Sequence, residues 1–341
     1  MKKKSAADAD TPRVSLPLDA PWFDAPLARV VDARSRGQLG QSLLVHAHPG
    51  AGGAPFARRV AQALLCEREG PGPCGECRGC VRVATGQHPD FFEVGPIEDS
   101  KQIRIEQVRD VLEGLAMGSY EGRATVIVFD PADSMNESSA NALLKNLEEP
   151  RRDAYLLLVA SQPSLLPATI RSRCLRIALP APTFDEAVAW LRERHPSEAW
   201  PAALQVLGVA PYDALQADPD ALRALRDDTW RTLKELPRGA IDVVRTAEGW
   251  ARGGEFLQRL SCLENCLTGL ALRRGEGSGK TSEMRPAPHL SGPELDINIA
   301  TTLALLDHLR ELRQQAASPL NKGLALERFL WRLTRAAVRQ A

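Results

Sequence analysis

The sequence predicts an α/β fold in which a parallel sheet domain is followed by a chain that is helical to its end. Up to about Leu179, short apolar runs of strand length alternate with helical patterns, which is typical of a parallel sheet covered on both faces. A glycine-rich turn at residues 48–53 joins the first strand to a helix, and this is the topology of a phosphate loop. After Pro180-Ala181-Pro182 the pattern is helical throughout.

The elements of the first part follow from their apolar patterns. A buried strand of a parallel sheet is a nearly continuous apolar run, whereas a helix repeats its apolar residues every three or four positions. Strands are expected at residues 43–47, 91–94, 125–129, 155–160 and 175–179. Helices are expected at about residues 54–65, 105–117 and 138–147.

The chain of 341 residues has room for two or three domains. Residues 1–18 are charged, small and interrupted by proline, and are expected to form a disordered tail. We expect an α/β domain at residues 19–180, a small domain of two or three short helices at 181–220 and a helical C-terminal domain at 221–341. Residues 275–292 are rich in Gly, Ser and Pro, which predicts a mobile loop between helices.

Charge and hydropathy limit the functional classes to which the protein could belong. Lys+Arg and Asp+Glu number 43 each, so overall charge gives no argument for nucleic-acid binding, and any DNA contact has to be local. We find no apolar run of about 18 residues and no charged-then-apolar leader with a small-residue cleavage site. A cytoplasmic protein without a membrane span is therefore expected.

The predicted phosphate loop lacks its chemistry. A working loop has the pattern G-x-x-x-x-G-K-[ST], because backbone N–H groups cradle the phosphates, the lysine neutralises their charge and the hydroxyl holds Mg²⁺. Here Ala47 takes the first glycine position, and Gly50 and Gly52 follow within the turn. Gly53 stands at the lysine position and Ala54 at the hydroxyl position. We expect a degenerate loop with no functional ATP site.

A second motif has lost its catalytic group as well. Residues 126–133 contain an apolar strand that ends in Asp130, as in the acidic motif of ATPases, but Pro131 stands where a catalytic glutamate would follow. The Gly-Lys-Thr sequence at residues 279–281 is not the true loop, because a helical pattern rather than a strand precedes it and Pro286 and Pro288 follow it. No ATPase activity is expected of the chain on its own.

Four of the seven cysteines, Cys66, Cys74, Cys77 and Cys80, crowd into residues 66–80. In a reducing compartment such crowding indicates a metal rather than disulfides. Four thiolates favour a structural zinc site, which has no open position for a water. An iron–sulfur cluster is the competing interpretation, because short Cys-x2-Cys runs also hold such clusters; free thiols are the third.

Two segments and the cysteine insertion together resemble one family. Residues 138–150, SSANALLKNLEEP, resemble the helix that follows the acidic motif in bacterial clamp-loader ATPases. Residues 166–174, LPATIRSRC, are similar to the Ser-Arg-Cys signature of the same family. The four-cysteine insertion is shared. The resemblance covers about residues 20–182 and implies an AAA+ fold of the P-loop type with a zinc-binding insertion, followed by a helical lid and a helical collar.

Within that family the chain resembles the delta-prime subunits of the DNA polymerase III clamp loader. The gamma/tau subunits keep the lysine and hydroxyl of the loop, whereas the delta-prime subunits have lost them and keep Ser-Arg-Cys. The resemblance implies that Arg173 is an arginine finger that acts in trans on the ATP of a neighbouring gamma/tau subunit. It further implies a hetero-oligomer with the gamma/tau and delta subunits, joined through the C-terminal domains, which loads the sliding clamp onto primed DNA as part of the polymerase holoenzyme.

Alternatives to this interpretation stay open. The chain could be an active gamma/tau-like ATPase, in which case the isolated protein would turn over ATP. It could instead be a zinc-dependent nucleic-acid-binding module, although the cysteine segment offers few cations beyond Arg68, Arg78 and Arg82. Arg171 and Arg173 could also be ordinary surface charges that flank a strand.

Overall fold

The fold is described from a computed structural model of the chain. It describes residues 16–338, except residues 69, 71, 98–99, 117, 276–287 and 317–320. The chain divides into two compact units, Met1–Ala181 and Pro182–Ala341. The expected tail therefore lies mostly outside the described residues, as do most of the expected mobile loop and the Gly-Lys-Thr sequence within it.

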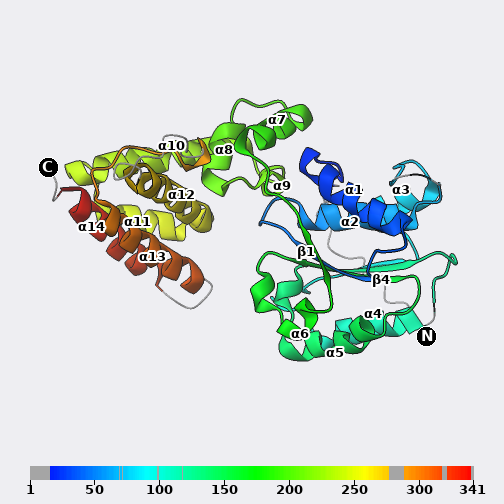
Figure 1. The fold of residues 1–341 in the computed structure, drawn as a ribbon. Helices are drawn as coiled ribbons and strands as arrows, with labels where there is room; N and C mark the ends of the chain where they lie inside the picture. Colours follow the sequence, from blue (N-terminus) through cyan, green and yellow to red (C-terminus); the bar gives the residue numbers. More distant parts are fainter. Residues whose placement is uncertain are drawn as a thin grey trace. The chain divides into compact units, whose positions relative to one another are not determined.

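The first unit is built on a five-stranded parallel sheet with the order β2-β3-β4-β1-β5 (Figure 1). Leu44 of β1 pairs with Leu158 of β4 on one side and with Arg176 of β5 on the other. The strands are β1 (Ser42–His46), β2 (Phe91–Val94), β3 (Thr125–Phe129), β4 (Ala154–Ala160) and β5 (Leu175–Ala178). Each lies within one residue of its predicted bounds, which confirms the predicted α/β fold with a parallel sheet.

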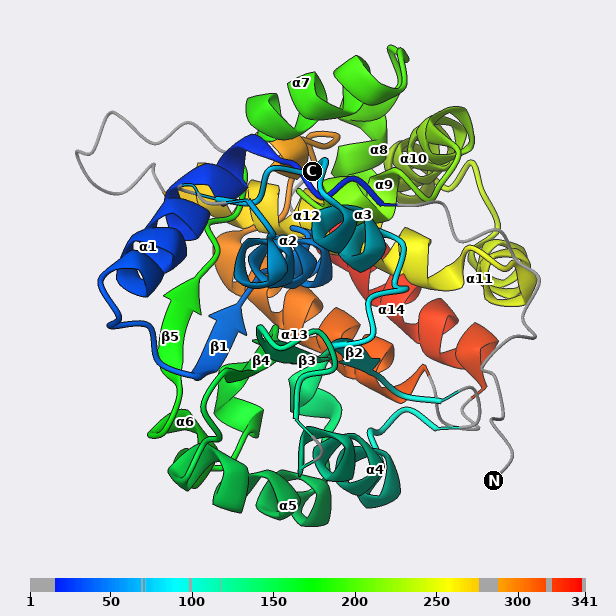
Figure 2. The same ribbon diagram turned by 90° about the vertical axis from the view of Figure 1, so that its right-hand side faces the viewer.

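Helices cover both faces of this sheet, with α1, α2 and α3 on one side and α4, α5 and α6 on the other (Figures 1 and 2). The first group comprises α1 (Asp24–Ser35), α2 (Gly53–Leu65) and α3 (Arg78–Ala84). The second comprises α4 (Ile105–Ala116), α5 (Glu137–Glu148) and α6 (Ala168–Arg171). Short 3-10 turns lie at Pro21–Phe23, Ala132–Ser134 and Pro163–Leu165.

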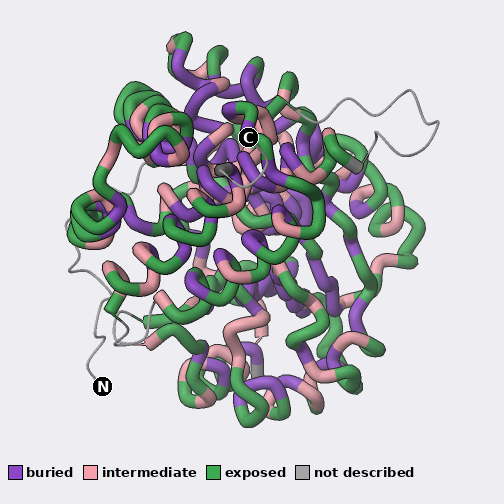
Figure 3. Tube along the Cα trace, turned by 90° about the vertical axis from the view of Figure 1, so that its left-hand side faces the viewer, coloured by how far each residue is buried: buried purple, intermediate pink, exposed green. Residues whose placement is uncertain are grey.

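The core beneath α4, α5 and α6 is apolar and closely packed. Buried side chains from these helices meet alternate residues of the strands, as expected for a helix-covered sheet. The buried and exposed residues alternate along the helices (Figure 3). The cluster includes Val108, Leu115, Leu143, Leu147 and Ile170 of the helices and Leu44, Ile127, Phe129, Leu156 and Leu158 of the strands.

The described residues of the second unit form helices joined by turns and loops, and no strand. Its first helices are short and its later ones longer, as the sequence predicts. They are α7 (Phe184–Arg194), α8 (Trp200–Leu207), α9 (Pro211–Ala214), α10 (Pro219–Glu235), α11 (Val243–Arg252), α12 (Phe256–Gly275), α13 (Ile299–Gln315) and α14 (Lys322–Val338), with 3-10 turns at Leu236–Arg238 and Pro288–Leu290.

Local signals fix several helix starts in this unit. Thr183 and Glu186 form a reciprocal capping box at the start of α7, and Asp242 caps α11 through two backbone N–H groups. Within the unit α8 packs against α10 and α12, and α11 packs against α14. No helix in the described part of the chain is both long and apolar enough to cross a membrane.

Candidate functional site

The loop after β1 has the backbone shape of a tight glycine turn. The Ala51 N–H donates to the carbonyl oxygen of His48 at 3.0 Å. Gly50 and Gly52 have φ angles of 71° and 90°, in the left-handed region that favours glycine. Gly52 is the N-cap of α2, so the loop delivers the chain into the start of this helix. The predicted strand, turn and helix are therefore all present.

Gly53 sits where the sequence template has its lysine, and it has no room for a side chain. A Cβ atom at Gly53 would lie 2.7 Å from Val159 Cγ1 of β4 and 2.9 Å from Ala47 Cβ. Contacts this short are essentially never seen for real Cβ atoms, so any residue other than glycine would require the Val159 side chain or the loop to shift. The loop is therefore closed by packing at the position where a lysine would have to enter.

Trp22 ties the same loop to the N-terminal segment. Its indole Nε1–H donates to the carbonyl oxygen of Ala51 at 2.8 Å, and the side chain is 6% exposed. The neighbouring Phe23 ring packs edge-on against Phe56 of α2, with ring centroids 5.4 Å apart. Sequence reasoning missed Trp22, because one aromatic residue before a helix carries no signal of its distant partner.

The acidic motif ends in a partly buried carboxyl group. Burial, and then the negative charges of Glu93 and Asp133, raise the pKa of Asp130 to about 6, while Arg58 partly opposes this shift. Arg58 itself pairs with Glu93 at 2.5 Å. The Asp133 carboxylate accepts hydrogen bonds from the backbone N–H groups of Ser161 and Gln162. Two other acidic side chains therefore lie near Asp130, and the glutamate that follows this aspartate in an ATPase is absent.

The four predicted cysteine ligands come together in the fold. The Sγ atoms of Cys66, Cys74, Cys77 and Cys80 all lie within 4.8 Å of one another. The pairs Cys66–Cys74, Cys66–Cys77 and Cys74–Cys80 are separated by 3.6, 3.9 and 3.9 Å. Zn–S bonds of about 2.3 Å in a tetrahedron place neighbouring sulfurs about 3.8 Å apart. The thiols therefore fit the edges of a tetrahedral four-sulfur site.

Backbone N–H groups point at these sulfurs and favour thiolates. The N–H groups of Cys77 and Glu76 lower the pKa of Cys74 to about 6. For Cys77, burial raises the pKa, but N–H bonds from Glu67 and Cys80 give a net lowering. Burial raises the pKa of Cys80. Thiolates are the form that binds metal, so the site is partly prepared for an ion.

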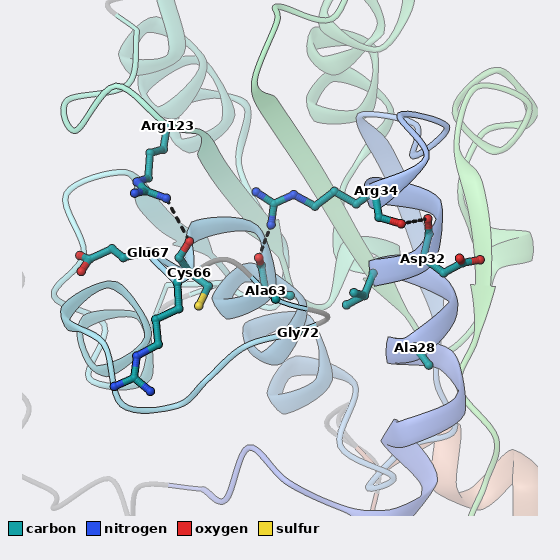
Figure 4. A pocket seen from close by; sticks show the side chains of 12 residues that line it. Ala28, Asp32, Arg34, Ala63, Cys66, Glu67, Gly72 and Arg123 are labelled. Atoms are coloured by element: carbon teal, nitrogen blue, oxygen red, sulfur yellow. Dashed lines mark hydrogen bonds between the residues drawn. The ribbon is translucent and has the colours of Figure 1, made fainter.

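Two arginines hydrogen-bond the C-terminal end of α2, where the cysteine segment begins (Figure 4). Arg123 donates to the carbonyl oxygen of Cys66 at 3.1 Å. Arg34 of α1 donates to the last-turn carbonyls of Ala63 and Leu64, the latter at 2.8 Å. Cations at a helix C-terminus satisfy its free carbonyls and its dipole. A cavity of about 780 Å³ lies between α1 and this segment.

Arg173 lies on the surface, just after α6. Its Nη2 pairs with Glu148 Oε1 at the end of α5, at 2.7 Å. Its Nη1 donates to the carbonyl oxygen of Thr169 at 3.0 Å. The side chain keeps 35% of its surface exposed. Arg173 is therefore accessible from outside its own chain, whereas the following Cys174 is 9% exposed and packs in the core.

Arg171 occupies a different environment. Together with Arg176 and His46 it lines an open cavity of about 500 Å³ near β1 and β5. Its Nε is buried and has no hydrogen-bond partner in the described part of the chain. Of these two arginines, Arg173 is the one whose two Nη atoms both make contacts among the described residues.

Comparison with known proteins decides the family. A curated "DNA polymerase III subunit delta'" from Pseudomonas aeruginosa is 36% identical over 234 residues, which cover 67% of this chain and 70% of that protein. The chain belongs to the DNA polymerase III delta' subunit family. The delta' subunit of Escherichia coli strain K12 is 33% identical over 330 residues, covering 92% of this chain and 94% of that one.

Two further matches agree with this delta' assignment. The profile of the family described as "DNA polymerase III, delta subunit" matches residues 25–183. The "DNA polymerase III subunit tau" of E. coli K12 is 32% identical over 195 residues, which are 56% of this chain but 30% of tau. The E. coli delta' subunit thus matches almost end to end, while tau matches over a smaller part.

Proposed function

We propose that this delta' family member is a non-hydrolysing subunit of the DNA polymerase III clamp loader. In this proposal it assembles with gamma/tau and delta subunits and helps them load the sliding clamp onto primed DNA. Family membership and the near full-length match to the E. coli delta' subunit support the assignment to this complex.

The lack of room for a side chain at Gly53 supports the proposal that the chain does not hydrolyse ATP. A phosphate-loop lysine neutralises the charge that builds up on the β- and γ-phosphates. Here even a Cβ atom would meet Val159 and Ala47 at less than 3 Å. Ala54 supplies no hydroxyl for Mg²⁺, and Pro131 supplies no carboxylate after Asp130. Three separate contributions to hydrolysis are missing from one pocket.

The exposed guanidinium of Arg173 supports the arginine-finger part. Hydrolysis spreads negative charge over the γ-phosphoryl oxygens in the transition state, and an arginine supplies planar, permanently charged donors to it. Both Nη atoms of Arg173 are held by its own chain, and its Nε–H, which has no acceptor among the described residues, is left for an incoming phosphate. We propose that this group enters the ATP site of the neighbouring gamma/tau subunit.

The cysteine cluster is proposed to hold a structural Zn²⁺. Cys66, Cys74, Cys77 and Cys80 would be its four ligands, and the sulfur separations of 3.6 to 3.9 Å support that choice. With four protein ligands there is no open position for catalysis. The ion would fix the segment between α2 and α3.

The second unit is proposed to contain the lid, residues 181–220, and the oligomerisation collar, residues 221–341. Several large apolar side chains of the collar segment are exposed, and apolar surface of this kind is typical of subunit interfaces. They are Leu257, Leu272, Ile299, Leu303, Leu324 and Trp331.

Reconstitution with gamma/tau and delta subunits tests the proposal. In a complex that carries Arg173→Ala, the ATP site that this arginine faces should lose on the order of 10³ in rate, so clamp- and DNA-stimulated turnover falls by the share of that site. Arg36→Ala is the matched control, because Arg36 is also exposed and paired to one carboxylate, Asp32. Assembly should be unchanged in both. Unaltered turnover with Arg173→Ala, or turnover by the isolated chain, would contradict the proposal.

A further inference from the structure

Arg173 is held between the ends of two helices. The helices α5 and α6 lie side by side (Figures 1 and 2). Glu148, the last residue of α5, pairs with Arg173 Nη2 at 2.7 Å. Thr169 of α6 accepts a hydrogen bond from Arg173 Nη1 at 3.0 Å. Nη1 also donates to Ser172 Oγ at 3.5 Å. Acceptors on two elements therefore fix the plane of the guanidinium, while its Nε–H has no acceptor among the described residues.

From this geometry we infer that Glu148 is a positioning residue for Arg173, an inference that rests on the proposed arginine-finger function. A long arginine side chain loses much rotamer freedom when it is fixed in one direction, and that loss opposes its insertion into a partner's site. If its own chain has already fixed the guanidinium, less freedom is lost when the phosphate arrives. Glu148 would thus act through Arg173 without touching ATP.

The location of Glu148 argues against a chance surface pair. A carboxylate at the C-terminal end of a helix faces the negative end of the helix dipole, which is an unfavourable place for it. Arg173 supplies the compensating positive charge. The next residue, Glu149, has the same charge and is exposed, yet makes no ion pair within the described chain. Only one of two adjacent glutamates is used to hold the arginine.

The direction of the effect can be stated from the same contacts. Glu148 contacts Nη2 at 2.7 Å, and the Nε–H of Arg173 has no acceptor among the described residues, so donors are left for a phosphate. The half-exposed carboxylate also withdraws little charge from the guanidinium, because water screens it. Fixing the arginine should therefore outweigh competition with the phosphate, and removing Glu148 should slow hydrolysis at the neighbouring site.

The test uses the reconstituted complex and the part of ATP turnover that Arg173→Ala abolishes. Glu148→Ala should lower the kcat of that part by about fivefold, the rate equivalent of a strong exposed charge pair, and leave its KM unchanged. Glu148→Gln retains an acceptor oxygen and should recover most of the rate. The matched control, Glu149→Ala, should behave as wild type. Glu148→Ala combined with Arg173→Ala should be no slower than Arg173→Ala alone.

Three outcomes are decisive. If Arg173→Ala itself leaves turnover unchanged, the arginine-finger function fails, and the role of Glu148 fails with it. If Arg173→Ala acts but Glu148→Ala leaves kcat unchanged or raises it, the positioning role is overturned while the finger stands. If Glu148→Ala lowers kcat equally in the Arg173→Ala background, its effect does not pass through the arginine, which also overturns the inference. Unchanged melting temperatures of the isolated variants confirm that the comparison concerns folded protein.

Discussion

Gly53 and Pro131 are residues at which the sequence departs from the ATPase template. The missing lysine could be recognised from the sequence, because the strand, turn and helix around it are local. The closure of that position could not, because it depends on Val159, which lies on β4 and far from Gly53 in sequence. The raised pKa of Asp130 also requires the fold, since Glu93 and Asp133 approach it from separate elements.

Substitution of Gly53 tests the closure. Gly53→Ala should destabilise the protein by about 1 to 3 kcal/mol, because the added Cβ meets Val159 and Ala47 and overpacks the region. Gly114→Ala on α4 is the matched control, since nothing lies within 4 Å of its added Cβ. Alanine in place of a helical glycine there should stabilise by up to about 1 kcal/mol. Thermal unfolding of both variants measures the difference, and equal effects would refute the closure.

The raised pKa of Asp130 predicts that the stability of the protein depends on pH. Its folded pKa of about 6 lies above the ordinary value of 3.8, so the folded state binds the proton more tightly than the unfolded state. Stability should therefore decrease as the pH rises from about 4 to about 6. At pH 7 the charged carboxylate costs up to about 3 kcal/mol, and Asp130→Asn should remove much of that cost.

An NMR titration of the Asp130 carboxyl carbon measures the pKa directly, and unfolding of Asp130→Asn at pH 5 and pH 7.5 measures the linkage. The exposed Asp110→Asn on α4 serves as control. A carboxyl pKa below 4 would show that this group contributes no such dependence.

Among the secondary-structure elements, the most deeply buried ones were predicted best from the sequence. The strands are buried on both faces, so each is a short apolar run, and their bounds were predicted within one residue. Helix α1 was not predicted, because it buries only Pro26 and Val30 and has little apolar pattern. Helix α3 was not predicted either. It begins at Cys77, whose sulfur accepts from the Cys80 N–H, so the cysteine cluster itself forms its N-terminus.

Removal of a ligand tests the cysteine element. Cys77→Ser should lose the zinc that the wild-type protein is expected to carry in a 1:1 ratio, because it removes both a ligand and the cap of α3. Amide exchange across residues 66–84 should then increase, while the sheet keeps its protection. Cys174→Ala is the control, since this buried thiol lies outside the cluster. Metal analysis that finds iron with sulfide, or no metal in the wild type, would contradict the zinc proposal.

At the scale of the whole molecule, the proposal separates chemistry from assembly. The first unit contains Arg173, the closed loop and the cysteine cluster, and the second unit exposes large apolar side chains such as Leu303 on its long helices. The sequence predicted those helices from their periodicity. It could not show which apolar residues stay outside the core, because Leu305 and Leu303 on α13 differ in burial only through the packing of their neighbours, at 3% and 50% exposed.

Disruption of that apolar surface should abolish assembly and leave the fold intact. Leu303 is half exposed on α13, one helical turn from the exposed Ile299, so Leu303→Asp places a charge on the surface without entering the core. The buried charge would cost several kcal/mol in an interface, whereas in the free chain it faces water. Size-exclusion chromatography with gamma/tau and delta subunits should show the variant eluting apart from the complex, with an unchanged melting temperature.

Tyr120→Asp in the first unit, at a side chain 89% exposed, is the matched control and should still assemble. Arg173→Ala should give the opposite pattern, a complete complex with reduced turnover. If Leu303→Asp assembles normally, α13 is not part of the oligomerisation surface.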